Sequence, residues 1–273
     1  MMNAFTAAES WTVGDVTLTS RFLLGTAGYP SPQVLREAIA AAGTQVVTVG
    51  LKRTLAAAGD NGFIGVIQQA LADAGARLLP NTAGCRSARE AIQLAHMARE
   101  LYGTPWLKLE VVGDEHTLQP DMFELHAAAT QLVKDGFTVF PYCTDDLVGC
   151  RRLLDAGCPL LMPWGAPIGS GQGLLNVFAL RTLRERLPDT TLIIDAGIGA
   201  PSDAAQALEL GFDAVLLNSA VSQARNPAAM ARAFRLAIEG GRIARMAGVM
   251  AQQDFAVAST PVGGEPQLLG GVA

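Results

Sequence analysis

The feature that most constrains the fold is a regular alternation of short β-rich runs with longer Ala- and Leu-rich segments of helical period. The β-rich runs lie at residues 22–25, 45–50, 77–80, 107–112, 138–142, 160–163, 191–195 and 214–218. The helical segments lie at residues 33–42, 63–75, 87–102, 121–135, 146–157, 174–187, 201–210 and 227–247. Strands that alternate with helices indicate parallel βαβ units. Eight such pairs in about 250 residues predict a (β/α)8 TIM barrel.

Residues at the segment ends support these boundaries. Ser31, which precedes Pro32, and Ser87 each stand before an apolar-periodic run, where helix N-caps are expected. Glycines stand where helix C-caps are expected, at Gly43, Gly75, Gly136, Gly157 and Gly211. The alternative, an open doubly wound sheet, would be favoured by a G-x-G-x-x-G turn after the first strand. The residues after that strand read Thr-Ala-Gly-Tyr-Pro, so the barrel is preferred.

The ends of the chain lie outside the repeat. Residues 11–18 carry a Gly-Asp turn between short β-rich arms, which predicts an N-terminal hairpin suited to plugging the bottom of the barrel. The tail from residue 248 is rich in Gly, Pro and Gln, and is expected to end flexibly or to cover the barrel mouth. We therefore expect one barrel domain spanning 1–273, with residues 1–10 and about 262–273 flexible.

Composition narrows the classes of partner. Half of the 273 residues are hydrophobic, which supports a large core in a single domain. The net charge is −5 and no Lys/Arg-rich run occurs, so neither nucleic acid nor an anionic membrane is an expected partner. The N-terminus has no leader-like pattern and no apolar run approaches the length of a membrane span, so we expect a cytoplasmic protein.

The run Trp106–Gly113 holds the most unusual pair of charges in the sequence. Lys108 and Glu110 are two residues apart in an otherwise apolar strand, so they share one face of it. Strands in a covered parallel sheet are buried on both faces. Two opposite charges that point into such an interior form either an ion pair or part of a site.

A lysine in this setting can act as a nucleophile. Burial should lower the pKa of Lys108 toward neutrality, and the free amine condenses with a ketone or aldehyde to a Schiff base. A purely structural ion pair with Glu110 is about equally plausible from the residues alone. Lys52, beside Arg53 at the end of the second strand, is a rival nucleophile, but adjacent basic residues at a strand end are more typical of a solvated or salt-bridged pair.

Further candidates follow the other strands, where barrel enzymes place their active sites. Asp195 ends the apolar run 191–195, and its carboxylate could shuttle protons or simply accept strand-end hydrogen bonds. Asn81-Thr82, Tyr142 and Asp145-Asp146 follow the third and fifth strands. Glycine-rich loops at 166–173 and 196–201, together with Asn218-Ser219, suggest an anion site of backbone N–H groups. The alternative is that the glycines only form tight turns.

Cysteine and histidine spacing does not indicate a metal site. No C-x-x-C pair is present among Cys85, Cys143, Cys150 and Cys158, and no histidine stands at ligand spacing from them. We therefore expect reduced structural thiols.

At these residues the sequence resembles the thiazole synthase of thiamin biosynthesis, from about Val16 to Pro261. The most distinctive matching runs are Pro-Asn-Thr-Ala-Gly at 80–84 and Gly-Ala-Pro-Ile-Gly-Ser-Gly at 165–171. Other matching runs are Phe-Leu-Leu-Gly-Thr at 22–26, Lys-Leu-Glu-Val at 108–111, Ile-Asp-Ala-Gly-Ile-Gly at 194–199 and Val-Leu-Leu-Asn-Ser at 215–219. Two departures, Trp164 and the Lys52-Arg53 pair, bear on pocket shape.

The resemblance implies a barrel enzyme that makes a thiazole phosphate from 1-deoxy-D-xylulose 5-phosphate, dehydroglycine and a sulfur-carrier protein with a C-terminal thiocarboxylate. It implies that Lys108 forms the imine and that Glu110 and Asp195 are the acid/base pair. It assigns the sugar phosphate to Gly169, Ala196, Gly197, Asn218 and Ser219. It implies no metal or organic cofactor, a separate dehydroglycine-producing enzyme as a further partner, and self-association.

Two other hypotheses share some of these features. Another Schiff-base aldolase or isomerase of sugar phosphates would use the same lysine and loops but need no sulfur carrier. A barrel that binds a sugar phosphate or a carrier without chemistry would form no covalent adduct at Lys108.

Overall fold

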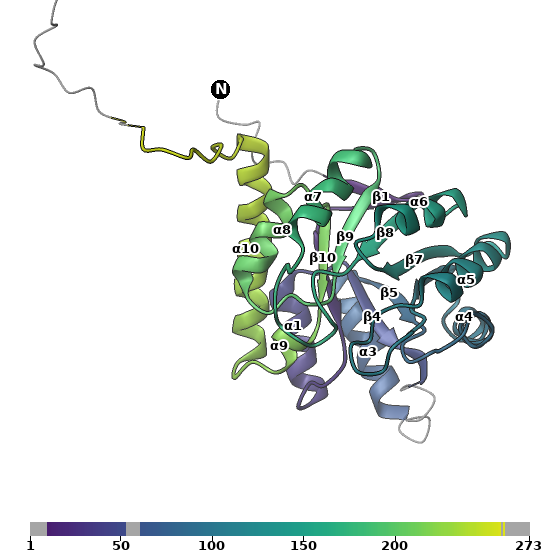
Figure 1. Ribbon diagram of the computed structural model, residues 1–273. Helices are drawn as coiled ribbons and strands as arrows, with labels where there is room; N and C mark the ends of the chain where they lie inside the picture. The colour runs from purple at the N-terminus through teal and green to yellow at the C-terminus, as the bar shows by residue number, and fades with distance from the viewer. Residues whose placement is uncertain (1–9, 53–60, 258, 260–273) are drawn as a thin grey trace, which may run out of the picture.

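The computed structural model describes residues 10–52, 61–257 and 259 of the chain. Its main sheet is a closed barrel of eight parallel strands in the order β10-β3-β4-β5-β6-β7-β8-β9 (Figure 1). The strands are β3 (Phe22–Gly25), β4 (Val46–Gly50), β5 (Arg77–Asn81), β6 (Trp106–Leu109), β7 (Thr138–Cys143), β8 (Leu160–Pro163), β9 (Thr191–Asp195) and β10 (Ala214–Leu217). The predicted (β/α)8 barrel is confirmed.

Helices surround the strands, as the sequence period predicted. They are α1 (Pro32–Ala42), α3 (Asn61–Ala74), α4 (Ala88–Tyr102), α5 (Met122–Lys134), α6 (Leu147–Asp155), α7 (Val177–Arg186), α8 (Pro201–Glu209), α9 (Ser219–Ser222) and α10 (Pro227–Ala247). The short helix α9 was not predicted. Helix α7 begins three residues later than predicted because Asn176 caps it, its side chain accepting from the Ala179 N–H. Strand β6 ends at Leu109, so Glu110 lies just beyond it.

Local chemistry fixes the helix ends where the sequence placed them. The Ser31 hydroxyl accepts from the Val34 N–H and the Ser87 hydroxyl from the Glu90 N–H, each at 3.3 Å. The five glycines predicted after helices all have positive φ, between 59° and 98°. Only glycine enters this region without a steric cost from Cβ, which explains why the helices end there.

The hairpin closes the barrel at the end where the strands begin. Strands β1 (Trp11–Val13) and β2 (Val16–Leu18) pair antiparallel, with Trp11 opposite Leu18. Both side chains belong to one buried cluster with Trp106 and Leu160, the first residues of β6 and β8. The predicted hairpin and its packing on the barrel bottom are confirmed, which leaves the opposite end of the barrel for a site.

Some sequence predictions concern segments beyond this description. Of the predicted flexible ends, residues 1–9 and 262–273 lie outside the described residues, and so does Arg53. Among the helices within the described ranges, none combines the length and apolar character required to cross a bilayer.

Candidate active site

Lys108 is held between two carboxylates inside the barrel. Its Nζ lies 3.0 Å from Oε1 of Glu110 and 2.6 Å from Oδ2 of Asp195, which ends β9. The three side chains retain only 5%, 6% and 3% of their exposure. Strand alternation predicted that Lys108 and Glu110 share a face, and barrel closure adds Asp195. The result is a buried triad of one cation and two carboxylates.

The electrostatics of the triad correct one prediction from the sequence. Burial does act to lower the pKa of Lys108, but the charges of Asp195 and Glu110 outweigh it and leave the pKa above its ordinary value. The expected shift toward neutrality was wrong because it counted desolvation without both partners. Burial also raises the pKa of Asp195 to about 6, although Lys108 opposes this rise. The pKa of Asp195 therefore lies within about one unit of neutral pH, where this carboxyl can exchange a proton.

Glu110 is positioned by Asn81, the last residue of β5, and by Thr82, which follows it. Asn81 Nδ2 donates to Glu110 Oε1 at 2.8 Å, the oxygen that also faces Lys108. The Thr82 hydroxyl donates to the Glu110 carbonyl at 2.9 Å and accepts from the Glu110 N–H at 2.8 Å. The sequence analysis included Asn81 and Thr82 among the strand-end candidates but assigned neither of them a role. Their position in the distinctive Pro-Asn-Thr-Ala-Gly run at 80–84 was the sequence feature that could have indicated a role in the site.

The polar candidates in and after β7 have different surroundings. Tyr142 is fully buried, with its ring centroid 5.8 Å from Lys108 Nζ, and burial raises the pKa of its hydroxyl well above the usual range. Within the described residues this hydroxyl has no hydrogen-bond partner. Asp146 instead caps α6 by accepting from the Gly149 N–H. Asp145 accepts from the Trp164 indole N–H at 3.1 Å, so both aspartates have structural roles.

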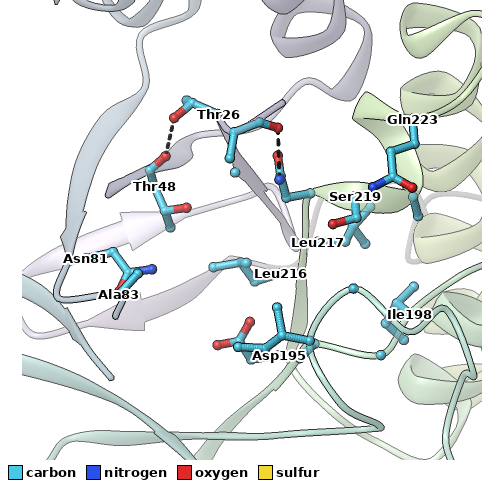
Figure 2. Close-up of a pocket in the computed structure, with 18 of the residues that line it drawn as sticks. Thr26, Thr48, Asn81, Ala83, Asp195, Ile198, Leu216, Leu217, Ser219 and Gln223 are labelled. Atoms are coloured by element: carbon cyan, nitrogen blue, oxygen red, sulfur yellow. Dashed lines mark hydrogen bonds between the residues drawn. The ribbon is translucent and has the colours of Figure 1, made fainter. Parts of the chain in front are cut away.

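A cavity of about 570 Å³ opens onto the triad at the ends of the barrel strands. It is lined by every residue that the sequence analysis assigned to the site, namely Lys108, Glu110, Asp195, Gly169, Ala196, Gly197, Asn218 and Ser219. Figure 2 shows Thr48 and Asn81 on one side of it and Ser219, Gln223 and Ile198 on the other, with Leu216 and Asp195 between them. The fold thus gathers side chains from distant strands around a single cavity.

The glycine loops are packed backbone against backbone, which only glycine permits. Gly197 has φ +85°, and a Cβ there would stand 2.3 Å from the Ala166 nitrogen. A Cβ on Gly199 would stand 2.3 Å from the Gly171 carbonyl oxygen. Ala196 itself has φ +69°, an uncommon conformation for a residue with a Cβ. The crowding of the loops therefore supports the interpretation that these glycines are needed for tight backbone turns. Because the loops also line the cavity, they can contribute backbone N–H groups to an anion site as well.

Comparisons with known proteins identify the family of the chain. The family model described as thiazole biosynthesis protein ThiG matches residues 12–261. The chain belongs to the ThiG family. Thiazole synthase of Coxiella burnetii (strain RSA 331 / Henzerling II) is 55% identical over 95% of this chain and 98% of its own. Thiazole synthase of Bradyrhizobium sp. (strain ORS 278) is 58% identical over 92% and 96%.

Membership of the ThiG family confirms the resemblance drawn from the sequence, and with it an enzyme of thiamin biosynthesis. A crystal structure of the Amycolatopsis orientalis BexX/CysO complex matches with a TM-score of 0.80 and 29% identity over 90% of this chain and 99% of that chain. 3-Hexulose-6-phosphate synthase from Salmonella typhimurium, at 16% identity and a TM-score of 0.56, shares the fold alone.

The two features noted as departures from the family lie outside the triad. Lys52 Nζ is 2.5 Å from Glu90 Oε1, and both side chains are about two-fifths exposed, at 41% and 42%. Lys52 is therefore in a partly exposed salt bridge, as the sequence favoured, and it does not belong to the described cavity lining. Trp164 forms a β-bridge with Asp195, but its indole N–H is directed to Asp145.

The cysteines are free and buried, with the Sγ atoms of Cys143 and Cys150 3.9 Å apart. Burial raises the pKa of Cys85 to about 11 and of Cys158 to about 12, so these thiols stay protonated at neutral pH.

Proposed function

We propose that this ThiG-family enzyme forms thiazole phosphate from 1-deoxy-D-xylulose 5-phosphate, dehydroglycine (2-iminoacetate) and sulfur from a carrier-protein thiocarboxylate, through a Schiff base at Lys108. The observation that carries the proposal is the buried Lys108 ammonium, within 3.0 Å of two carboxylates on the wall of one cavity. An amine with proton acceptors on either side suits a reaction that needs several proton transfers in sequence.

In the first step Lys108 must become a neutral amine. Asp195 is the nearest acceptor, at 2.6 Å, and its pKa, raised by burial to about 6, makes it a stronger base than an ordinary carboxylate. The amine then adds to the ketone carbon of the sugar. Asp195 returns the proton to the hydroxyl of that adduct, which leaves as water and yields the imine.

In the next steps a carboxylate moves protons along the sugar. Glu110 is suited to remove the proton from the carbon beside the imine, because Asn81 and Thr82 fix its position. Tautomerisation shifts the carbonyl along the chain, sulfur enters from the thiocarboxylate, and condensation with dehydroglycine closes the ring. Asn81 Oδ1 is buried and without a partner in the described chain, so we expect it to accept from a sugar hydroxyl.

We assign the phosphate group to the loops that follow β8, β9 and β10. Gly169, Ala196, Gly197, Asn218 and Ser219 from these loops line the same cavity, and Lys108 is the sole basic side chain among the described lining residues. We infer that backbone N–H groups and the Ser219 hydroxyl hold the anion, as loops after the last barrel strands commonly do. Helix α8 is not the site, because Asp203 already accepts from the Gly199 and Ala200 N–H groups.

Protein partners complete the proposal. The structural neighbour BexX was solved in complex with a second protein, CysO, which supports a protein partner for this chain. We assign that role to a sulfur carrier whose C-terminal tail reaches the cavity, and we expect a separate enzyme to supply dehydroglycine. We further propose a cytoplasmic homo-oligomer that needs no metal or organic cofactor of its own, and one domain over 1–273.

Borohydride trapping tests whether Lys108 forms the Schiff base. The enzyme is incubated with 1-deoxy-D-xylulose 5-phosphate and borohydride, and its intact mass and the modified peptide are measured. We expect a reduced adduct on Lys108 in the wild type and in Lys52→Ala, but none in Lys108→Ala. An adduct on Lys52 would support Schiff-base chemistry but show that Lys52, and not Lys108, is the nucleophile. No adduct with ligand binding intact would favour a non-catalytic barrel, and product formed without a thiocarboxylate donor would favour an aldolase or isomerase.

A further inference from the structure

The ring of Tyr142 lies inside the barrel, beside the triad. Strand β7 pairs with β6 so that Phe140 stands opposite Lys108, and residues two apart on a strand point to the same side. Phe140 and Met162, the residue opposite Tyr142 on β8, both belong to the buried cluster on the inner side of the strands. Tyr142 therefore projects inward, and its ring centroid lies 5.8 Å from Lys108 Nζ. This distance is within the range of a cation–π contact.

The hydroxyl of Tyr142 is buried without a hydrogen-bond partner among the described residues. Burying a hydroxyl in this way is unfavourable, and phenylalanine would fill the same space without that cost. Burial, together with the negative charges of Asp195 and Glu110, raises the pKa of this hydroxyl far above neutral pH. The hydroxyl is therefore a hydrogen-bond donor close to two carboxylates, and it keeps its proton while they react.

Imine formation changes the number of donors that face these carboxylates. The Lys108 ammonium has three N–H groups, and its nitrogen faces Glu110 at 3.0 Å and Asp195 at 2.6 Å. When the ammonium condenses with the ketone, two of its hydrogens leave with the ketone oxygen as water. The protonated imine keeps one N–H. Because one N–H cannot be directed at both carboxylates, one of them loses its donor.

Asp195 is the carboxylate with more to lose in this change. Glu110 Oε1 also accepts from Asn81 Nδ2 at 2.8 Å, so it keeps a hydrogen bond whatever happens at Lys108. Oδ2 of Asp195 faces Lys108 and receives no other hydrogen bond from the part of the chain that the structure describes. An ionised carboxylate that is buried without a donor is strongly unfavourable. A new donor to Asp195 would therefore favour the protonated imine.

We propose that Tyr142 is a positioning residue that donates its hydroxyl hydrogen to Asp195 once Lys108 has become the protonated imine. The hydrogen bond keeps Asp195 ionised and in place beside the cationic imine, and the ring of Tyr142 remains available to that positive charge. The proposal rests on the Schiff base at Lys108 and adds a residue to that step. It also explains why the free enzyme buries a hydroxyl where phenylalanine would fit.

The variant Tyr142→Phe tests the hydroxyl alone, because it keeps the ring. We expect kcat for thiazole phosphate formation to fall roughly 10- to 100-fold, the range for one hydrogen bond to a charged group, with a much smaller effect on KM. The adduct on Lys108 that limiting cyanoborohydride traps at saturating sugar phosphate should fall by a similar factor, because its hydride adds only to the imine carbon. The control is Tyr29→Phe, which should change neither quantity. Tyr29 also buries a hydroxyl without a partner among the described residues, but burial alone raises its pKa, so no carboxylate of the triad acts on it.

Two further readouts separate this role from a structural one. Because the hydroxyl has no described partner in the free enzyme, Tyr142→Phe should unfold at or above the wild-type Tm without substrate. A clearly lower Tm would show that the hydroxyl is already bonded in the free enzyme, and would overturn the proposal.

The second readout is the pH dependence of the rate. The charged groups that act on Asp195 are Lys108 and Glu110, in and just after β6, and its neighbours toward β8 and β10 are uncharged. Tyr142→Phe leaves all of these in place. Without the donor the pKa of Asp195 should rise only in the imine, so the acidic decline of kcat should move up by about one to two pH units. The decline of kcat/KM, which reports the free enzyme, should stay near pH 6.

The outcomes distinguish this proposal from the proposed function. A wild-type adduct on Lys108 together with an unchanged kcat in Tyr142→Phe would overturn the role of Tyr142 and leave the Schiff base intact. The same holds if kcat and kcat/KM shift alike with pH in this variant. If the wild type forms no adduct on Lys108, the proposed function fails, and with it the step in which Tyr142 would act.

Discussion

Replacing Lys108 with Met should destabilise the fold in a pH-dependent way. Methionine nearly preserves the volume of the side chain but removes the charge that faces Glu110 at 3.0 Å and Asp195 at 2.6 Å. Breaking a buried ion pair from one side costs about 3–5 kcal/mol, because an uncompensated buried charge remains. Both carboxylates are at least 94% buried, since their exposure is 6% and 3%, so we expect this full range at pH 8.

The sign of the pH dependence follows from Asp195. Its pKa is already raised to about 6, and removing Lys108 removes the charge that holds it down. A native state with a raised carboxyl pKa binds more protons than the unfolded chain, so stability falls as pH rises through that window. We expect the loss at pH 5 to be smaller than at pH 8 by about 2 kcal/mol, since each pKa unit is worth about 1.4 kcal/mol.

Urea unfolding followed by circular dichroism at pH 5 and pH 8 measures the loss of unfolding free energy and its dependence on pH. The double variant Lys108→Met/Asp195→Asn should regain part of the lost stability, because it removes one of the two uncompensated carboxylates. Lys52→Met is the control, and its exposed pair with Glu90 should be worth at most about 1 kcal/mol. A loss for Lys108→Met that is no larger than this control, or that is equal at both pH values, would refute the charged triad.

Three further predictions follow from the same geometry. The ratio kcat/KM should fall about tenfold per pH unit below about pH 6, because protonated Asp195 accepts no further proton. The pH–rate profile of Asp195→Asn should lack this decline at acidic pH. Asn81→Ala should lower kcat roughly 10- to 100-fold with a smaller effect on KM, because Glu110 loses a charge-assisted hydrogen bond of about 1.5–3 kcal/mol; unchanged kcat would show that Asn81 has no positioning role. Gly197→Ala should destabilise the protein by at least about 1–3 kcal/mol, because a Cβ there has no room. Gly65→Ala in α3, where a Cβ meets nothing within 4 Å, should instead stabilise the protein by about 0.5–1 kcal/mol. Opposite signs of the two stability changes in thermal unfolding would confirm the backbone argument, and equal signs would contradict it.

Much of the site could be anticipated because a parallel barrel collects the ends of its strands in one place. Lys108, Asp195 and the loop residues through Ser219 all follow from strand positions and line the cavity as a result. Their chemical roles remain proposals. Asn81 was harder to assign, because a polar residue at a strand end gains its meaning only from a partner 29 positions away.

The sequence by itself determined the local structure of this protein. Strands β3, β8 and β9 begin and end at the predicted residues, and Ser31 and Ser87 start their helices, because periodicity and capping depend only on near neighbours. The tertiary structure decided the charge state of Lys108. Desolvation is a property of one buried residue, but the pKa depends on the sum over its surroundings, and barrel closure supplied the second carboxylate at 2.6 Å.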